Sequence, residues 1–137
     1  MIILQYKVNE IDWYASLYKK VFPDDPINYP SEVYVGYEQD RIVGFASGYP
    51  MDPYTWYLQR AGVVPEERSK TKIVNWYINL LKEIDKVWPA VLTLVGNSNI
   101  RTLKLDMAMG FRIVGTRMDS GHNLWVELLR LREIQDG

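Results

Sequence analysis

The sequence contains no cysteine and only one histidine, His122, among its 137 residues. The absence of cysteine excludes disulfide bonds, thiolate metal sites and a cysteine nucleophile. A single histidine excludes a metal site built from several imidazoles, and we expect no bound metal. No apolar run is long enough to span a membrane. The apolar run at the N-terminus reaches Lys7 too soon for a signal peptide. We therefore expect a cytoplasmic protein without a membrane partner.

The sequence also lacks an excess of charge of one sign. It contains 16 Lys and Arg and 17 Asp and Glu, which gives a net charge of −1. A nucleic-acid binder normally carries a basic surplus, so the balance argues against such a partner. If nucleic acid were bound, the candidate contacts would be Arg68, Lys70, Lys72, Arg101 and Lys104. The length and the 47% hydrophobic content fit one globular domain over residues 1–137. The sequence leaves a homodimer open.

Apolar periodicity predicts an α/β protein. Strands are predicted at residues 1–8, 33–37, 41–48, 54–64, 90–95, 111–118 and 123–131. Helices are predicted to begin near residues 9, 69 and 99. Because helices alternate with strands at two places, we expect a mixed sheet of about seven strands, with helices on both faces and a parallel pair in its core. The strand at 123–131 is apolar on both faces, which is typical of a central strand.

Single residues indicate where these helices begin and end and which of their faces are buried. Asn9 is a candidate N-cap for the first helix, and Gly110 is a natural end for the third. Gly62, inside a strand, marks a bulge or a close approach of another chain segment. The third helix is predicted to bury an apolar face formed by Ile100, Leu103 and Met107.

Three segments in this order resemble the GNAT superfamily of acyl-CoA-dependent N-acetyltransferases. The hairpin of residues 33–37 and 41–46 is similar to the second and third strands of that family. Residues 63–73 look like its strand-to-helix turn that holds coenzyme A. Asn99, followed by a helix ending at residues 109–111, looks like its second cofactor segment. The resemblance implies a GNAT-like fold, acetyl-CoA as co-substrate and an amine as acceptor.

The segment at 63–73 has a physical basis of its own for binding phosphate. A strand that enters a helix through a tight turn leaves backbone N–H groups unpaired at the helix start, where the helix dipole favours an anion. The alternative is that its basic residues form a solvated face. The predicted cofactor contacts are Val63, Val64, Arg68, Ser69, Lys70, Thr71, Lys72, Ile73 and Asn99. Thr71 stands where the family has glycine, and Ile73 where it has a small residue.

The resemblance also implies catalytic positions. A backbone N–H at about Val63 would stabilise the charge that develops on the thioester oxygen. Asp106 occupies the place of the tyrosine that protonates the departing thiolate in the family. A carboxyl serves as an acid only if burial raises its pKa, and the alternative is that Asp106 is a solvated helix residue. Tyr57 stands where some relatives carry a glutamate base.

Other residues have both a chemical and a structural interpretation. Glu66 and Glu67 are either a water-mediated proton relay or the surface of a turn, and His122 is either a base or the border of a hairpin. Aromatic residues near the Pro-rich segment 23–31 either wall an acceptor pocket or pack in the core: Tyr29, Tyr34, Tyr49, Tyr54 and Trp56.

These observations lead to two candidate functions. The first is an N-acetyltransferase that moves an acetyl group from acetyl-CoA to an amine of a small molecule or a protein by direct attack. The alternative is a catalytically impaired GNAT-fold protein that binds or regulates, which the residues at positions 71, 73 and 106 favour.

Overall fold

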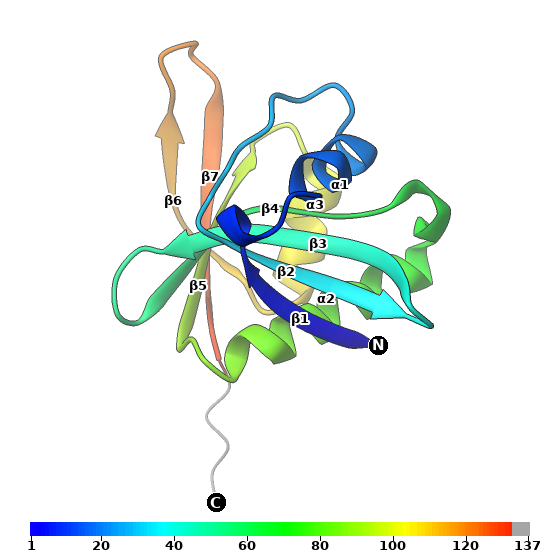
Figure 1. The fold of residues 1–137 in the computed structure, drawn as a ribbon. Helices are drawn as coiled ribbons and strands as arrows, with labels where there is room; N and C mark the ends of the chain where they lie inside the picture. The colour runs from blue at the N-terminus through cyan, green and yellow to red at the C-terminus, as the bar shows by residue number, and fades with distance from the viewer. Residues whose placement is uncertain (133–137) are drawn as a thin grey trace, which may run out of the picture. The chain divides into compact units, whose positions relative to one another are not determined.

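The computed structural model describes residues 1–132 as three α-helices, two short 3-10 helices and seven strands (Figure 1). The elements are β1 (Ile2–Lys7), η1 (Val8–Glu10), α1 (Tyr14–Val21), β2 (Glu32–Glu38), β3 (Arg41–Pro50), β4 (Thr55–Val63), η2 (Pro65–Glu67), α2 (Lys70–Asp85), β5 (Ala90–Gly96), α3 (Ile100–Ala108), β6 (Arg112–Met118) and β7 (Leu124–Leu131). The sheet order is β1-β2-β3-β4-β5-β7-β6, which confirms the mixed seven-stranded sheet. No helix within the described chain has the length and apolar content needed to cross a membrane.

The chain forms two compact units. The first contains Met1–Tyr49 and Gln59–Ile84, and the second contains Pro50–Leu58 and the chain from Asp85 onward. The expectation of one domain stays a prediction.

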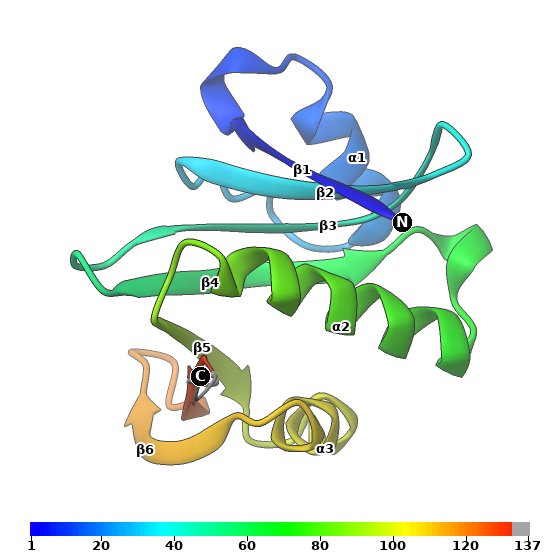
Figure 2. The same cartoon turned by 90° about the horizontal axis from the view of Figure 1, so that it is seen from below.

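In the first unit, α1 and α2 cover opposite faces of the strands (Figure 2). On one face, Phe45 of β3 packs against Tyr14 and Tyr18 of α1, with ring centroids 6.0 Å and 5.7 Å apart. Successive side chains of a strand point to opposite faces, so Gly44 faces the other way. There, a Cβ atom on Gly44 would lie 3.2 Å from the Trp76 ring of α2. The prediction of helices on both faces is confirmed for this unit.

The predicted N-cap at Asn9 is wrong, because α1 begins at Tyr14. Residues Val8–Glu10 form a separate 3-10 turn. Val8 is buried, and its backbone N–H donates to the Ser31 carbonyl oxygen at 3.0 Å. This contact with a distant segment holds the chain in a turn before the helix begins.

In the second unit, β4 pairs with β5 in parallel over Thr55–Leu58, β5 pairs with β7, and β7 pairs with β6. The parallel pair is therefore confirmed. β7 is paired on both sides, but it lies next to the edge strand β6 and is not central in the sheet. Gly110 has φ +95° and ends α3, because the Phe111 N–H donates to the Asp106 carbonyl and the Gly110 N–H to the Met107 carbonyl. This is the Schellman arrangement, in which glycine adopts the left-handed conformation.

The predicted buried face of α3 is wrong. Ile100 is 54% exposed and Met107 is 53% exposed, whereas Asp106 is only 2% exposed. The helix therefore turns inward a carboxyl-bearing side chain from the edge of the predicted apolar stripe.

Gly62 of β4 lies against the end of α1, as its sequence position predicted. A Cβ atom there would be 2.6 Å from Val21 Cγ1 and 2.9 Å from Phe22 Cζ. We expect Gly62→Ala to lower the free energy of unfolding by about 1–3 kcal/mol, because the added methyl overpacks this contact. Urea unfolding measures the change. Gly96→Ala is the control, since a Cβ on Gly96 meets nothing within 4 Å. Equal effects of the two substitutions would contradict the close contact.

Candidate functional site

The end of β4 presents one backbone N–H group away from β3. The Val64 N–H donates to the Val43 carbonyl oxygen of β3 at 2.9 Å. Neighbouring N–H groups of an extended strand point to opposite sides, so the Val63 N–H is directed away from β3. Pairing of β4 with β5 covers Thr55–Leu58, and Val63 lies beyond it. This orientation suits the role of a hydrogen-bond donor to a ligand.

The chain then enters α2 through the turn η2, whose hydrogen bonds use most of the local N–H groups. The N–H groups of Glu67 and Arg68 donate to the carbonyl oxygens of Val64 and Pro65. Ser69 precedes the helix, and its hydroxyl oxygen accepts the Lys72 N–H at 3.2 Å, as in an N-cap.

Two N–H groups remain at the start of α2, those of Lys70 and Thr71. The first N–H groups of a helix have no intrahelical acceptor, and within residues 1–132 neither of these two N–H groups has a hydrogen-bond acceptor. The Lys70 and Thr71 side chains are exposed, and Ile73 is half-buried. The helix start therefore offers paired donors and a lysine to an anion.

Thr71 adopts ordinary backbone angles although the family has glycine at this place. Positive φ among the described non-glycine residues is confined to Gln39, Asp40 and His122. The conformational freedom of glycine is therefore not required at position 71.

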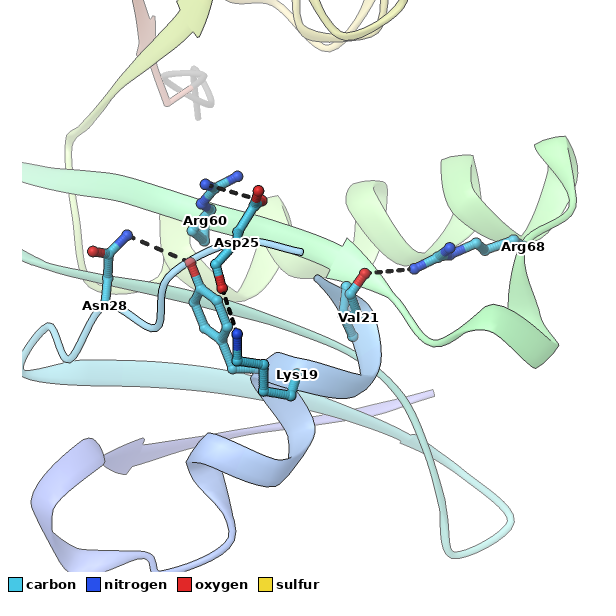
Figure 3. Close-up of polar contacts among 7 residues, drawn as sticks. Lys19, Val21, Asp25, Asn28, Arg60 and Arg68 are labelled. Atoms are coloured by element: carbon cyan, nitrogen blue, oxygen red, sulfur yellow. Dashed lines mark hydrogen bonds and ion pairs between the residues drawn. The ribbon is translucent and has the colours of Figure 1, made fainter. Parts of the chain in front are cut away.

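Arg68 links the end of β4 to the end of α1 (Figure 3). Its Nε donates to the Val63 carbonyl oxygen at 3.0 Å, and its Nη2 donates to the Val21 carbonyl oxygen at 2.8 Å. A cation at the last carbonyl groups of a helix is also favoured by the helix dipole. The structure thus gives Arg68 a positioning role, and its contact with a cofactor stays a prediction.

Glu67 is buried, so its interpretation as turn surface is wrong. Its side chain is 3% exposed, and its carboxylate pairs with Arg41 Nη1 at 3.1 Å and with Lys72 Nζ at 3.0 Å. Sequence reasoning missed Arg41, which comes from the start of β3, because nothing in the local spacing connects it with the turn. Two cations are thereby held beside the start of α2.

Glu66 is exposed, in agreement with the surface interpretation, and pairs with Lys20 at 3.1 Å. Its own backbone N–H, followed by Lys20, holds the pKa of the Glu66 carboxyl below its usual range. A low pKa makes a carboxylate a weak base. Glu66 is therefore poorly suited to take a proton from an amine.

The remaining predicted site residues lie in the second unit. Asn99 caps α3, with its side-chain oxygen accepting the Thr102 N–H at 3.3 Å. Asp106 is buried, so its interpretation as a solvated residue is wrong. Tyr57 is half-buried and pairs in register with Leu92 of β5. His122 is exposed with φ +64° in the β6–β7 turn, as its hairpin interpretation states.

The aromatic candidates divide between core and surface. Tyr34 and Trp56 are buried, whereas Tyr29, Tyr49 and Tyr54 are 66%, 41% and 68% exposed. Of these three, Tyr29 packs against Tyr14, with ring centroids 5.9 Å apart. Within residues 1–132, no group of three His, Asp or Glu side chains is arranged to hold a metal ion.

The contrast between two adjacent glutamates can be tested directly. We expect Glu67→Gln to lower the free energy of unfolding by about 1–3 kcal/mol, because it removes both ion pairs of a buried carboxylate whose partners remain partly solvated. Glu66→Gln should leave unfolding nearly unchanged, because its ion pair is exposed. Chemical denaturation of both variants checks this. A silent Glu67→Gln would show that the buried pairs contribute nothing.

Solved structures with the same architecture are acetyltransferases. The chain is similar to a Bacillus subtilis acetyltransferase in complex with CoA, with a TM-score of 0.76, 18% identity and coverage of 96% of this chain and 98% of that chain. A GNAT family acetyltransferase from Elizabethkingia anophelis with acetyl-CoA bound has a TM-score of 0.61 at 17% identity, covering 95% and 98%. A mutant spermidine N-acetyltransferase from Vibrio cholerae has a TM-score of 0.77 at 8% identity, covering 96% and 95%. No family model and no curated protein matches the sequence. The chain therefore adopts the fold of the GNAT acetyltransferases.

Proposed function

We propose that the protein is an acetyl-CoA-dependent N-acyltransferase that moves an acetyl group to an amine of a small molecule or a protein. The observation that carries the proposal is the junction between β4 and α2. There, an N–H group at Val63 and the two N–H groups at Lys70 and Thr71 are held by one short turn. The similar structures from Bacillus subtilis and Elizabethkingia anophelis, which hold CoA and acetyl-CoA, support it.

In this proposal the start of α2 binds the pyrophosphate of acetyl-CoA. The N–H groups of Lys70 and Thr71 donate to phosphate oxygens, and the helix dipole and the Lys70 ammonium add positive potential. Lys72 and Arg41, already held by Glu67, contribute further positive charge nearby. The half-buried position of Ile73 leaves the exposed side of the turn to the ligand.

The chemistry requires one donor and two proton transfers. As the amine attacks the thioester carbon, the carbonyl oxygen gains negative charge, and the Val63 N–H stabilises it. As the carbon–nitrogen bond forms, the amine nitrogen loses a proton to water, the bond between the acyl carbon and sulfur breaks, and the departing sulfur gains a proton. The family resemblance implies Asp106 as the acid for the second transfer, and this role stays a prediction for a residue that is buried within the second unit. Holding the amine and the thioester together supplies much of the rate.

The second candidate is a catalytically impaired protein of the same fold. It rests on the departures from the family pattern at Thr71, Ile73 and Asp106. Such a protein would bind acetyl-CoA without releasing free CoA. An assay of thiol release with a broad panel of amines separates the two candidates.

Acetyl-CoA should stabilise the protein against thermal unfolding. At a concentration 100 times Kd the gain is about 2.7 kcal/mol, roughly 5–15 °C in Tm for a chain of this size. Lys70→Glu should abolish most of the shift, because it replaces a cation at the proposed phosphate site by an anion. The same reversal in the last turn of α2, Lys82→Glu, should preserve the shift.

The substitution Lys70→Glu is not expected to weaken folding. A glutamate at the start of a helix favours the unliganded fold, so loss of the shift in Lys70→Glu cannot come from weakened folding. Wild-type Tm that does not move at millimolar acetyl-CoA would overturn the proposed function.

A further inference from the structure

Arg60 of β4 carries hydrogen-bond donors that the fold does not use. Its Nη2 pairs with Asp25 Oδ2 at 3.2 Å (Figure 3). Its guanidinium carbon lies 4.9 Å from the centroid of the Phe22 ring. Among residues 1–132, Nη1 and Nε of Arg60 have no hydrogen-bond partner, and the side chain is 35% exposed. A guanidinium stacked on a ring, with free donors, is well suited to binding a carboxylate.

The segment that carries Asp25 is anchored to α1. Lys19 Nζ donates to the Asp25 carbonyl oxygen at 2.8 Å, and Asn28 Nδ2 donates to the Tyr18 hydroxyl at 3.4 Å. Burial raises the pKa of Tyr14 to about 12, so its hydroxyl keeps the proton that it donates to the Asn28 carbonyl oxygen at 2.8 Å. Asp25 and Phe22 therefore hold the Arg60 guanidinium in one place.

Arg60 lies on the face of β4 opposite to the proposed cofactor site. Gly62 faces Val21 and Phe22 of α1, and Arg60, two residues earlier, shares that face. The start of α2 belongs to the helix on the other face (Figure 2). The face that carries Arg60 is therefore the one that adjoins Gly62, the residue before Val63. The proposal places the attacking amine on this face.

The spacing along the strand fits a small acceptor. Arg60 and Val63 are three residues apart, about 10 Å along a strand. The Phe22 ring connects the two positions, because its edge adjoins Gly62, the residue before Val63, and its face carries the Arg60 guanidinium. An amine reacting beside Val63 would thus bring an attached carboxylate toward Arg60.

We propose that Arg60 binds a carboxylate of the acceptor, so that the preferred acceptors are small amino acids, amines that carry a carboxylate. This inference rests on the proposed acetyl transfer. The competing explanation is that Arg60 only ties the segment 23–31 to β4 through Asp25.

The test compares amines that carry a carboxylate with the corresponding carboxamides, which have the same shape and lack the negative charge. Glycine, β-alanine and 4-aminobutanoate are assayed beside their carboxamides, and kcat/KM is measured from CoA release. We expect Arg60→Gln to lower kcat/KM for the preferred acid about 10- to 100-fold, the effect of losing a charged hydrogen bond. The carboxamide should change little. Comparing the acid-to-amide ratio of the variant with that of the wild type cancels the different basicities of the two amines.

Asp25→Asn is the matched control, because it breaks the same ion pair and leaves the Arg60 donors in place. If Arg60 binds the acceptor, Asp25→Asn keeps or raises the acid-to-amide ratio while Arg60→Gln lowers it. Equal changes in the two variants would show that the pair only anchors the segment and would overturn the proposal. No turnover of any acid by the wild type would also overturn it.

These outcomes are separate from failure of the proposed function. The Tm shift with acetyl-CoA is measured on the same wild-type preparation. If acetyl-CoA stabilises the protein and other amines are acetylated, only the acceptor class is wrong. If acetyl-CoA does not bind, the proposed function itself fails.

Discussion

The two hydrogen bonds of the Arg68 guanidinium fix the junction on which the candidate site depends. They join the carbonyl of Val63, at the end of β4, to the carbonyl of Val21, at the end of α1. Next to this anchor, the hydrogen bond from the Val64 N–H to Val43 directs the Val63 N–H away from β3. The turn η2 then leads directly into α2. Phe22 follows Val21 directly, so the ring beneath the Arg60 guanidinium is positioned by the same anchor.

Around this anchor, charge is arranged in pairs. Glu67 is buried beneath the start of α2 and holds Arg41 and Lys72, while Glu66 holds Lys20. A buried carboxylate next to a phosphate site would be unfavourable alone, but two cations more than compensate its charge. Thr71 needs no glycine-like conformation. The departures from the family's turn are therefore compatible with phosphate binding through the backbone.

Features encoded within a few neighbouring residues could be predicted from the sequence. The hairpin of β2 and β3, the long helix α2 and the stop at Gly110 all follow from local periodicity or turn chemistry. Features set by distant contacts could not. Asp106 turns inward while Ile100 and Met107 face solvent, although apolar spacing suggests the reverse. The partnership of Glu67 with Arg41 joins residues 26 positions apart in the chain, and no motif records it. Arg68 was predicted from its charge, which says nothing about the carbonyl groups that its guanidinium reaches.

The most direct measurement is the response of individual backbone amides to acetyl-CoA in two-dimensional 1H–15N NMR spectra. The account predicts that the largest chemical-shift changes fall on Val63, Lys70 and Thr71, because these N–H groups gain hydrogen bonds to the ligand. The Val64 amide, whose N–H already donates to Val43, should respond less than the Val63 amide. Saturable shifts confined to other parts of the chain, with these three amides unmoved, would contradict the account.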